Sequence, residues 1–202
     1  MIKYLLPLSI LLTLFGCRDN DPSDNFVLDP AVQRQIDIDL INEYILENGY
    51  ADFQVDTTVS GARYIILDYG DTLTAETSIE DNDSVRLDYT GVSLDDIVFS
   101  TSVDSVATDE SIELDPPLSI LYLESGENIE GTYIPGFAEG VIETFKEVGV
   151  GSHILFLLPS DLAFGNVPLS VTRIINNEIV VVEIPENSPL VWKVSPFEVK
   201  KQ

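Results

Sequence analysis

Aromatic residues near the ends of predicted strands are the side chains of this sequence that most suggest a binding site. In the stretch 85–99, apolar and polar residues alternate up to Tyr89, which is typical of a strand with one buried face. Gly91 follows closely, and Phe99 ends the stretch. An aromatic side chain that precedes a glycine at a strand end can face a concave surface. We therefore interpret 85–99 as a candidate wall of an apolar pocket, with an ordinary antiparallel hairpin as the alternative.

Most side-chain chemistry is excluded by what the sequence lacks. His153 is the only histidine and Cys17 the only cysteine, which leaves no Ser-His-Asp or Cys-His set. Gly149 and Gly151 are not followed by the Lys-Ser/Thr pair of a phosphate-binding loop, and the acidic residues have no calcium-loop spacing. We therefore expect no metal and no cofactor, and an enzyme built on this sequence has to work without a nucleophile or a base. His153 is expected to face solvent on a strand.

The charge of the sequence is strongly negative and limits the partners of the protein. It has 202 residues, enough for one domain with appendages, and 45% of them are hydrophobic, which favours a globular protein over a disordered one. The formal net charge is −25, and no Lys or Arg occurs from Leu87 to Phe145. Such a chain repels nucleic acid and anionic lipid headgroups, so neither is an expected partner.

The N-terminal residues have the pattern of an export signal that ends in a lipid attachment site. Lys3 precedes an apolar run that ends at Phe15 and is too short to span a bilayer. Gly16 and Cys17 then resemble the bacterial lipobox, in which the cysteine is lipidated. We expect residues 1–16 to be a lipoprotein signal peptide and Cys17 to carry the lipid, with a plain signal peptide as the alternative. The lipid would anchor the protein in the cell envelope, at the outer membrane on its periplasmic or surface face.

A flexible tether and one amphipathic helix are predicted between this signal and the rest of the sequence. Residues 17–28 are polar and are expected to form the tether. Within residues 29–50, Asp29 can cap a helix and Asn48-Gly49 can end it. The helix could dock on the following domain or pair with a second copy, and the sequence leaves this choice and the oligomeric state open. Spacings of three and four residues predict one buried apolar stripe, formed by Ile36, Leu40, Ile41, Tyr44 and Ile45.

The remaining residues predict an antiparallel α+β domain, with five or six strands around one short helix. That helix follows the turn Ile134-Pro135-Gly136-Phe137 and is expected to bury Phe137, Val141 and Phe145. The acidic segment Ser100–Asp115 has no periodicity and is expected to be a loop. Asn176-Asn177 is expected to form a tight hairpin turn. The predicted strands and short apolar runs lie at 61–68, within 85–99, and at 118–123, 152–158, 171–175, 178–184, 190–194 and 196–199.

Five segments, in the right order, resemble FKBP-type peptidyl-prolyl cis-trans isomerases. The stretch 85–91 with Val98-Phe99 is similar to the strand and bulge of that family, and Ile134-Pro135-Gly136-Phe137 with Glu139-Gly140 is similar to its helix entry. The other matching segments are 148–151 with 157–159, 162–165, and 184–194. We take 57–202 as the isomerase domain. The predicted signal and helix in front of it also resemble exported FKBP-type lipoproteins of Bacteroidetes-like bacteria.

The resemblance implies a fold and an activity. The fold is a twisted antiparallel sheet wrapped around a short α-helix, with an aromatic pocket between them. The activity is isomerisation of Xaa–Pro bonds in exported proteins, without a cofactor and with Pro-containing polypeptides as clients. Phe137 would form the pocket floor, and the backbone N–H of Ile134 would hold a client carbonyl. By position, the implied site residues are Tyr89, Phe99, Ser100, Ile134, Phe137, Phe164, Ile184 and Trp192.

Three of these positions differ from the residues usual in the family. Ser100 stands where Asp is usual, Phe137 where Trp is usual, and Phe164 where Tyr is usual. The segments 100–130 and 166–183, which border the pocket in the family, are long enough to cover it or to hold a client. A second hypothesis is therefore a weakly active or inactive FKBP-like chaperone that binds Pro-containing or apolar segments. A purely structural envelope lipoprotein is the third.

Overall fold

The computed structural model describes residues 28–74, 76–123 and 134–201. The predicted signal peptide, Cys17 and the tether up to residue 27 lie outside the described residues, as does the 100–130 segment from residue 124 on. Within the described ranges the helices are α1 (Pro30–Glu47), η1 (Tyr50–Asp52), α2 (Asp104–Glu110), α3 (Pro135–Phe145) and η2 (Ser160–Leu162). The strands there are β1 (Asp56–Thr57), β2 (Arg63–Asp68), β3 (Ser84–Ser93), β4 (Val98–Thr101), β5 (Leu118–Leu121), β6 (His153–Leu158), β7 (Leu169–Ile175), β8 (Glu178–Ile184) and β9 (Leu190–Lys200).

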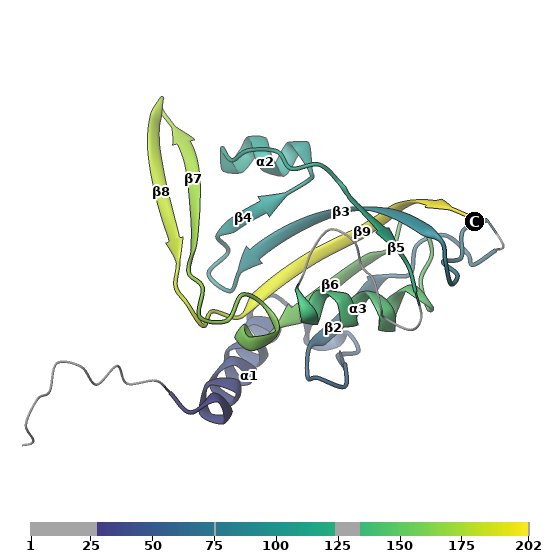
Figure 1. Ribbon diagram of the computed structural model, residues 1–202, viewed down its shortest axis with the longest axis horizontal. Helices are drawn as coiled ribbons and strands as arrows, with labels where there is room; N and C mark the ends of the chain where they lie inside the picture. Colours follow the sequence, from purple (N-terminus) through teal and green to yellow (C-terminus); the bar gives the residue numbers. More distant parts are fainter. Residues whose placement is uncertain (1–27, 75, 124–133, 202) are drawn as a thin grey trace, which may run out of the picture.

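The strands form one large antiparallel sheet and a separate hairpin (Figure 1). In the described part of the chain the large sheet has seven strands, in the order β1-β2-β6-β9-β3-β4, and β5 also pairs with β3. The long strand β9 lies near the centre, between β6 and β3. The architecture confirms the predicted antiparallel α+β fold, although more strands form than the five or six expected.

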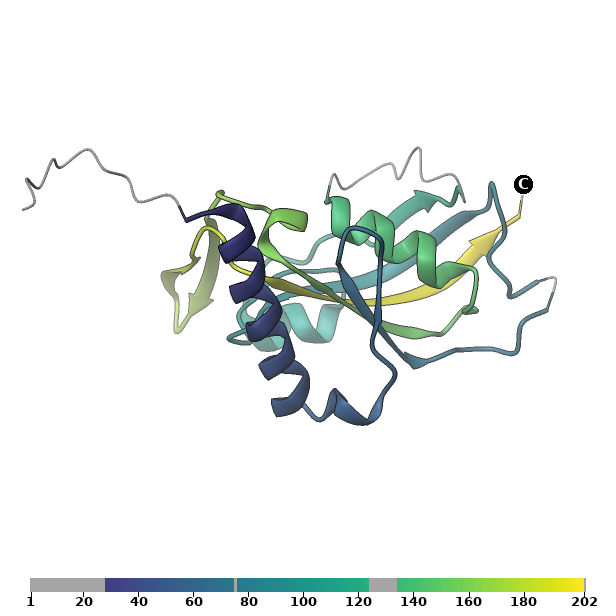
Figure 2. The same cartoon turned by 90° about the horizontal axis from the view of Figure 1, so that it is seen from below.

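Different helices cover the two faces of the sheet (Figure 2). Successive residues of β6 point to opposite sides, so Phe156 lies in the core beneath α3 and Leu157 in the core beneath α1. We call these two cores the α3 layer and the α1 layer. The buried residues of the α1 layer are Ile41, Tyr44, Ile45, Ile65, Leu155, Leu157 and Val191. The aromatic residues buried in the α3 layer are Tyr64, Tyr89, Tyr122, Phe137, Phe145, Phe156 and Trp192.

Helix α3 packs close to the sheet because a glycine faces it. A Cβ atom on Gly140 would lie 2.6 Å from the ring of Phe156, so a side chain there would push the helix away. Phe137, Val141 and Phe145 are 1%, 0% and 1% exposed, which confirms the predicted buried stripe. The tight approach places the start of α3 directly beneath the central strands.

Helix α1 docks on the opposite face of the sheet. As predicted for its cap, Asp29 Oδ1 accepts a hydrogen bond from the N–H of Ala31 at 2.8 Å. Ile41, Tyr44 and Ile45 are buried against the sheet. Of the two arrangements left open by the sequence, docking on the domain is therefore present. None of the helices in the described ranges is long and apolar enough to cross a membrane.

The predicted apolar stripe of α1 is wrong at its N-terminal end. Ile36 and Leu40 are each 40% exposed, whereas Asp37 is fully buried. The buried face therefore runs from Asp37 to Ile41, Tyr44 and Ile45, which keeps the helical spacing. A buried carboxylate is tolerated there because neighbouring N–H and O–H groups donate to it, as described below.

Two segments differ from their predicted secondary structure. Helix α2 forms inside the acidic segment that was expected to be a loop. It is short, it lacks a side-chain cap at Val103 and it buries only Ala107, so the sequence carries no periodic signal for it. Strand β9 is continuous where two strands were expected around Pro196. The pairing register with β3 shifts at this point, and such a bulge accommodates a proline that has no N–H to share.

The hairpin β7–β8 confirms the predicted tight turn. Asn176 and Asn177 have φ angles of 52° and 63°, as a type I′ turn requires at both central residues. Figure 1 shows the hairpin projecting away from the large sheet, next to α2 and β4.

Candidate functional site

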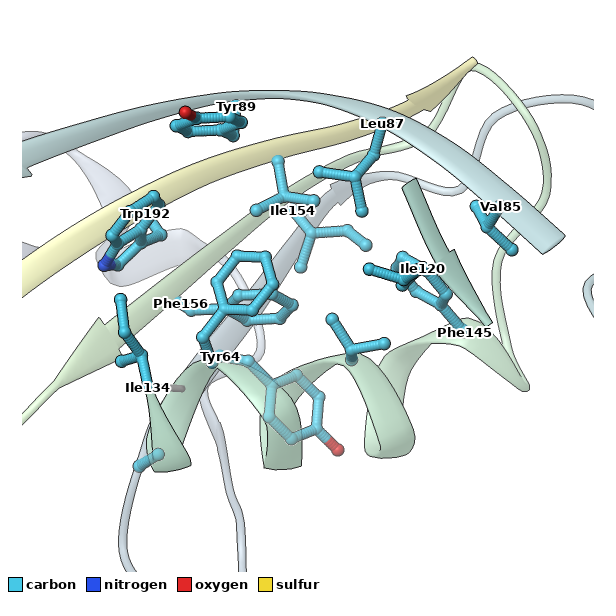
Figure 3. Packing of buried hydrophobic residues seen from close by; sticks show 14 of the residues in the cluster. Tyr64, Val85, Leu87, Tyr89, Ile120, Ile134, Phe145, Ile154, Phe156 and Trp192 are labelled. Atoms are coloured by element: carbon cyan, nitrogen blue, oxygen red, sulfur yellow. The ribbon is translucent and has the colours of Figure 1, made fainter. Parts of the chain in front are cut away.

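Aromatic rings gather around Trp192 in the α3 layer (Figure 3). The ring centroids of Tyr89, Phe99 and Phe137 lie 5.4, 5.5 and 5.4 Å from that of Trp192. Phe164 joins at the edge, with its centroid 6.2 Å from that of Phe99. We call these five rings the Trp192 cluster. They come from β3, β4, α3, the segment after η2, and β9, so the fold brings together side chains that lie far apart in the sequence.

Sheet register and a glycine set the position of the rings. Trp192 pairs with Gly91 on β3 and with Phe156 on β6. A Cβ atom on Gly91 would lie 2.5 Å from the ring of Phe99. Phe99 therefore lies over the bare backbone of β3 and meets the indole of Trp192 edge-on, at an interplanar angle of 82°. The glycine noted in the sequence thus makes room for one wall of the cluster.

Three rings of the cluster are buried, and two lie at its partly exposed edge. Tyr89, Phe137 and Trp192 are 7%, 1% and 3% exposed. Phe99 and Phe164, by contrast, are only partly buried. The partly exposed edge of the cluster is therefore formed by Phe99 and Phe164.

The two isoleucines of the predicted site have different positions. Ile134 is the N-cap residue of α3, is 4% exposed and belongs to the same core as the Trp192 cluster. Ile184, at the end of β8, packs in a neighbouring core at the base of the hairpin. Phe99 and Phe164 border both cores. Ile184 therefore supports the outer rings and does not belong to the core that holds Trp192.

A chain of hydrogen bonds links Tyr89 to a carboxylate that nothing in the local sequence marks. The Ser100 hydroxyl lies 2.7 Å from Asp115 Oδ2 and 3.3 Å from the Tyr89 hydroxyl oxygen. Ser100 is the donor in both contacts, so its single proton is shared between Asp115 and the Tyr89 hydroxyl oxygen, and the proton of Tyr89 stays available. The backbone N–H of Asp115 donates to the Thr101 carbonyl at 2.9 Å, which holds the carboxylate in place. Position 100 has no acid, but a carboxylate reaches it from fifteen residues downstream.

The environment keeps the Tyr89 hydroxyl protonated. Burial raises the pKa of Tyr89 above its ordinary value of 10.0, the bond with Ser100 opposes this shift, and the charge of Asp115 adds to it. The backbone of Tyr89 is fixed as well, because its N–H donates to Ser102 Oγ at 2.9 Å. The N–H of Ser102 in turn donates to the Tyr89 carbonyl at 3.0 Å. Tyr89 is therefore a well-positioned neutral donor.

Helix α1 anchors the segment that carries Phe164. Asp37 accepts hydrogen bonds from the Ser160 N–H at 2.8 Å and from the Ser160 hydroxyl at 2.6 Å. An ion pair between Arg34 and Asp161, at 2.5 Å, adds to this contact. An acidic residue among the apolar positions of a helix stripe is the sequence signal that could have revealed this role of Asp37.

The hairpin β7–β8 carries exposed apolar residues toward its turn, whereas the base of the hairpin packs beside Phe99 and Phe164. Ile174, Ile179 and Val181 are 63%, 75% and 56% exposed. A hollow of about 580 Å³ lies between β7 and α2, lined in part by Ile112, Leu114 and Ile174. The described parts of the two long segments thus form α2, β5 and this hairpin.

The titratable side chains of the described residues do not form a metal site. His153 is exposed on β6, as predicted. In the described part of the chain, no three His, Cys, Asp or Glu side chains lie close enough together to hold a metal ion.

The sequence and the structure both have known relatives. The family model of FKBP-type peptidyl-prolyl cis-trans isomerases matches residues 75–195. FkpA from Escherichia coli is 25% identical, with a TM-score of 0.46 over 84% of this chain and 63% of that one, so the chain spans less than two-thirds of FkpA. A peptidyl-prolyl cis-trans isomerase from Pseudomonas syringae pv. tomato is 15% identical, with a TM-score of 0.49; the match covers 87% of this chain and 98% of that one. The structure of the three FKBP domains of wheat FKBP73 is 16% identical, with a TM-score of 0.48; the match covers 74% of this chain and 50% of that one. No curated protein matches the chain.

Proposed function

Because the chain belongs to the FKBP-type peptidyl-prolyl cis-trans isomerase family, we propose that it catalyses rotation about Xaa–Pro bonds of other polypeptides. The observation that carries this proposal is the Trp192 cluster, whose rings all come from the region matched by the family model. Its two partly buried rings, Phe99 and Phe164, give an apolar prolyl ring a way in.

The reaction suits an apolar site that moves no proton. Rotation about an amide bond crosses a barrier of about 18–20 kcal/mol, and free Xaa–Pro bonds exchange in roughly tens to hundreds of seconds. The barrier arises because the twisted amide loses C–N double-bond character. The twisted amide is also less polar than the planar one, so water-excluding rings favour the twisted state. Each tenfold gain in rate needs only about 1.4 kcal/mol of such preference.

Tyr89 is the polar side chain of the proposed site. Its neutral hydroxyl can bond a substrate peptide, and the Ser100–Asp115 pair orients it. In this proposal Asp115 supplies the carboxylate that is missing at position 100. Phe137 and Phe164 lack the polar groups that the family usually has there, which makes the site more apolar and lowers its affinity for small peptides.

An exchange measurement tests the activity. We would use the chain from Arg18 on, which omits the predicted signal and Cys17 and keeps every described residue, and follow an Xaa–Pro peptide by exchange NMR. We expect faster cis–trans exchange, and about a tenfold smaller gain with Tyr89→Ala. Tyr69→Ala, at a side chain that is 58% exposed, is the control and should change nothing. No acceleration by the folded protein at high concentration would overturn the proposal.

We further propose that the protein acts in the cell envelope, on exported Pro-containing clients, anchored by a lipid on Cys17. The support is the sequence of the first 17 residues, with a charged start, an apolar run and the Gly16-Cys17 pair. Cys17→Ser should release the protein from the membrane fraction, because a chain of net charge −25 has no attraction for anionic lipid. If the variant remains in the membrane fraction, a lipid on Cys17 is not what anchors the protein, and the proposal is overturned.

The hairpin β7–β8 favours a second candidate function, that of a chaperone-like module that binds apolar segments. Its exposed Ile174 and Ile179 offer apolar area near the turn of the hairpin, and the hollow next to α2 extends this area. The two functions can coexist, because the hairpin would hold a client while the rings act on its proline.

Separate variants distinguish the two functions. The double variant Ile174→Ser with Ile179→Ser should bind a Pro-free unfolded polypeptide several-fold more weakly, with unchanged turnover of a short Xaa–Pro peptide. Leu46→Ser on α1, where the side chain is 68% exposed, is the matched control. Equal binding by the double variant and the wild type would exclude the hairpin as a client surface.

A further inference from the structure

The indole N–H of Trp192 is a buried donor without an acceptor. Trp192 is 3% exposed, and among the described residues its Nε1 has no hydrogen-bond partner. An indole nitrogen can only donate, and buried polar atoms in native proteins are nearly always bonded. A phenylalanine could supply a ring at this position without leaving a donor unbonded. The unused donor therefore points to an acceptor that arrives with a ligand.

This donor faces the start of α3. In Figure 3 the nitrogen of Trp192 lies on the side of the ring that points toward Ile134. Ile134 is the N-cap residue of α3, and its side chain caps nothing. The N–H groups of Gly136 and Phe137 in the first turn have no acceptor within the helix, and the described residues offer them none. A side-chain donor and the positive end of a helix thus meet at the same corner of the Trp192 cluster.

We propose that Trp192 is a substrate-binding residue, whose Nε1–H donates a hydrogen bond to the prolyl carbonyl oxygen of a bound Xaa–Pro segment. This inference rests on the proposed isomerase function. The acceptor has to be neutral, because the surrounding rings penalise a buried charge and the net charge of −25 repels an anion. A carbonyl oxygen has two lone pairs, so it can accept from the indole and from a backbone N–H at the start of α3 together.

The chemistry of rotation selects the prolyl carbonyl over the carbonyl of the preceding residue. A donor on the preceding carbonyl would stabilise the planar amide, with its C–N double-bond character, and would slow the reaction. The prolyl carbonyl belongs to the next peptide unit and does not take part in the bond that turns. A hydrogen bond there fixes the proline ring against the rings of the cluster without resisting rotation. No covalent bond is formed or broken.

The test uses the fact that Trp192 is the only tryptophan of the chain. The chain from Arg18 on therefore gives a single indole N–H signal in a ¹H–¹⁵N spectrum. Titration with an Xaa–Pro peptide should shift this proton downfield and slow its exchange with water. The same peptide with alanine in place of proline is the control and should leave the signal where it is.

Two variants remove the donor in different ways. Trp192→Phe should raise KM for the Xaa–Pro peptide about fivefold, the value of one neutral hydrogen bond, with kcat nearly unchanged. A tryptophan analogue with sulfur in place of the N–H group keeps the shape of the indole and should raise KM equally. This second variant separates the loss of the donor from repacking of a smaller ring.

The outcomes separate this inference from the function on which it rests. If the peptide is turned over, yet its binding leaves the indole signal unmoved and the sulfur analogue leaves KM unchanged, the inference is overturned and the isomerase function stands. If the peptide moves the indole signal downfield without being turned over, the donor role holds and the isomerase function fails. If the peptide is not turned over and does not shift the indole N–H signal, the donor role of Trp192 and the isomerase function are both overturned.

Discussion

The two layers of the sheet are built from the same strands, but they differ in the kind of side chain they bury. The buried residues of the α1 layer are aliphatic except for Tyr44, whereas the α3 layer holds buried rings from four strands, a helix and the segment after β5. Leu157 in the α1 layer and Trp192 in the α3 layer are 0% and 3% exposed. The leucine side chain carries no polar atom, whereas the indole of Trp192 has a buried N–H group without an acceptor. Aliphatic side chains fill space, while rings also present edges, faces and donors that a ligand can use. Burial alone therefore does not distinguish the proposed site from the core.

The two layers are joined at one point that matters for the site. Asp37 belongs to α1, but its carboxylate holds Ser160, and the segment after Ser160 carries Phe164 on the other side. A helix that covers one face thus positions a wall of the cluster on the other. Substitutions in each layer can show whether the α1 layer is structural and the α3 layer functional, and where that division fails.

The sharpest test compares two neighbouring leucines on β6 that face opposite layers. Leu157 and Leu158 are both fully buried, in the α1 layer and the α3 layer respectively. Either change to alanine should lower the free energy of unfolding by about 2–5 kcal/mol, because each leaves a cavity. Urea denaturation measures this loss. Only Leu158→Ala should also lower kcat/KM of the folded protein, because Leu158 contacts the start of α3 near Gly136. Equal kinetic effects of the two changes would contradict a division by layer.

The next largest effect is expected where the layers are joined. Asp37→Ala leaves the N–H and hydroxyl of Ser160 without their acceptor and should cost about 1.5–3 kcal/mol of stability. It should also raise KM, since the segment with Phe164 loosens, and hydrogen exchange of the Ser160 amide should become faster. Asp39→Ala, on an exposed position of the same helix, is the control. Unchanged exchange at Ser160 in Asp37→Ala would show that α1 does not hold this wall.

A smaller change in free energy, mainly in activity, is expected at the partly exposed edge of the cluster. Phe99→Ala should lower kcat/KM about tenfold, or about 1.4 kcal/mol, because an outer ring that contacts Trp192 is lost. The stability loss should be modest, since Phe99 is only partly buried. Phe197→Ala on β9, where the ring is 38% exposed and lies under Arg86, is the matched control. A Phe197 variant as slow as the Phe99 variant would mean that the assay reports strand stability and not the cluster.

The smallest effect concerns the proton of Tyr89. Asp115→Asn removes a negative charge that raises the pKa of Tyr89, so this pKa should fall toward its ordinary value. Activity should be independent of pH near neutrality and should decline only in the alkaline range, where the hydroxyl ionises, with the decline beginning at lower pH in the variant. NMR titration of the tyrosine ring and the pH dependence of kcat/KM measure the two shifts. Asp109→Asn, exposed on α2, should leave both unchanged.

Local patterns in the sequence predicted most, but not all, of the helices and strands of the domain. Alternation predicted the strands, i to i+4 spacing predicted the buried stripe of α3, and Asn176-Asn177 predicted the hairpin turn. These signals are reliable because each depends on residues that are neighbours in the chain. The short helix α2 was missed because it makes no such pattern and is held by contacts with the rest of the fold.

The composition of the Trp192 cluster was implied by a family resemblance, but its geometry was decided by tertiary structure. Only the folded chain shows that Phe99 lies over Gly91, that Asp115 reaches Ser100, and that Ile184 belongs to another core. The same holds for Asp37, which is buried where the predicted stripe of α1 had Ile36 and Leu40. Such contacts join residues far apart in sequence, so their selection depends on packing across the whole sheet and not on local periodicity. The sequence determined which rings were available near Tyr89, and the tertiary structure determined which of them meet and which donor is left free.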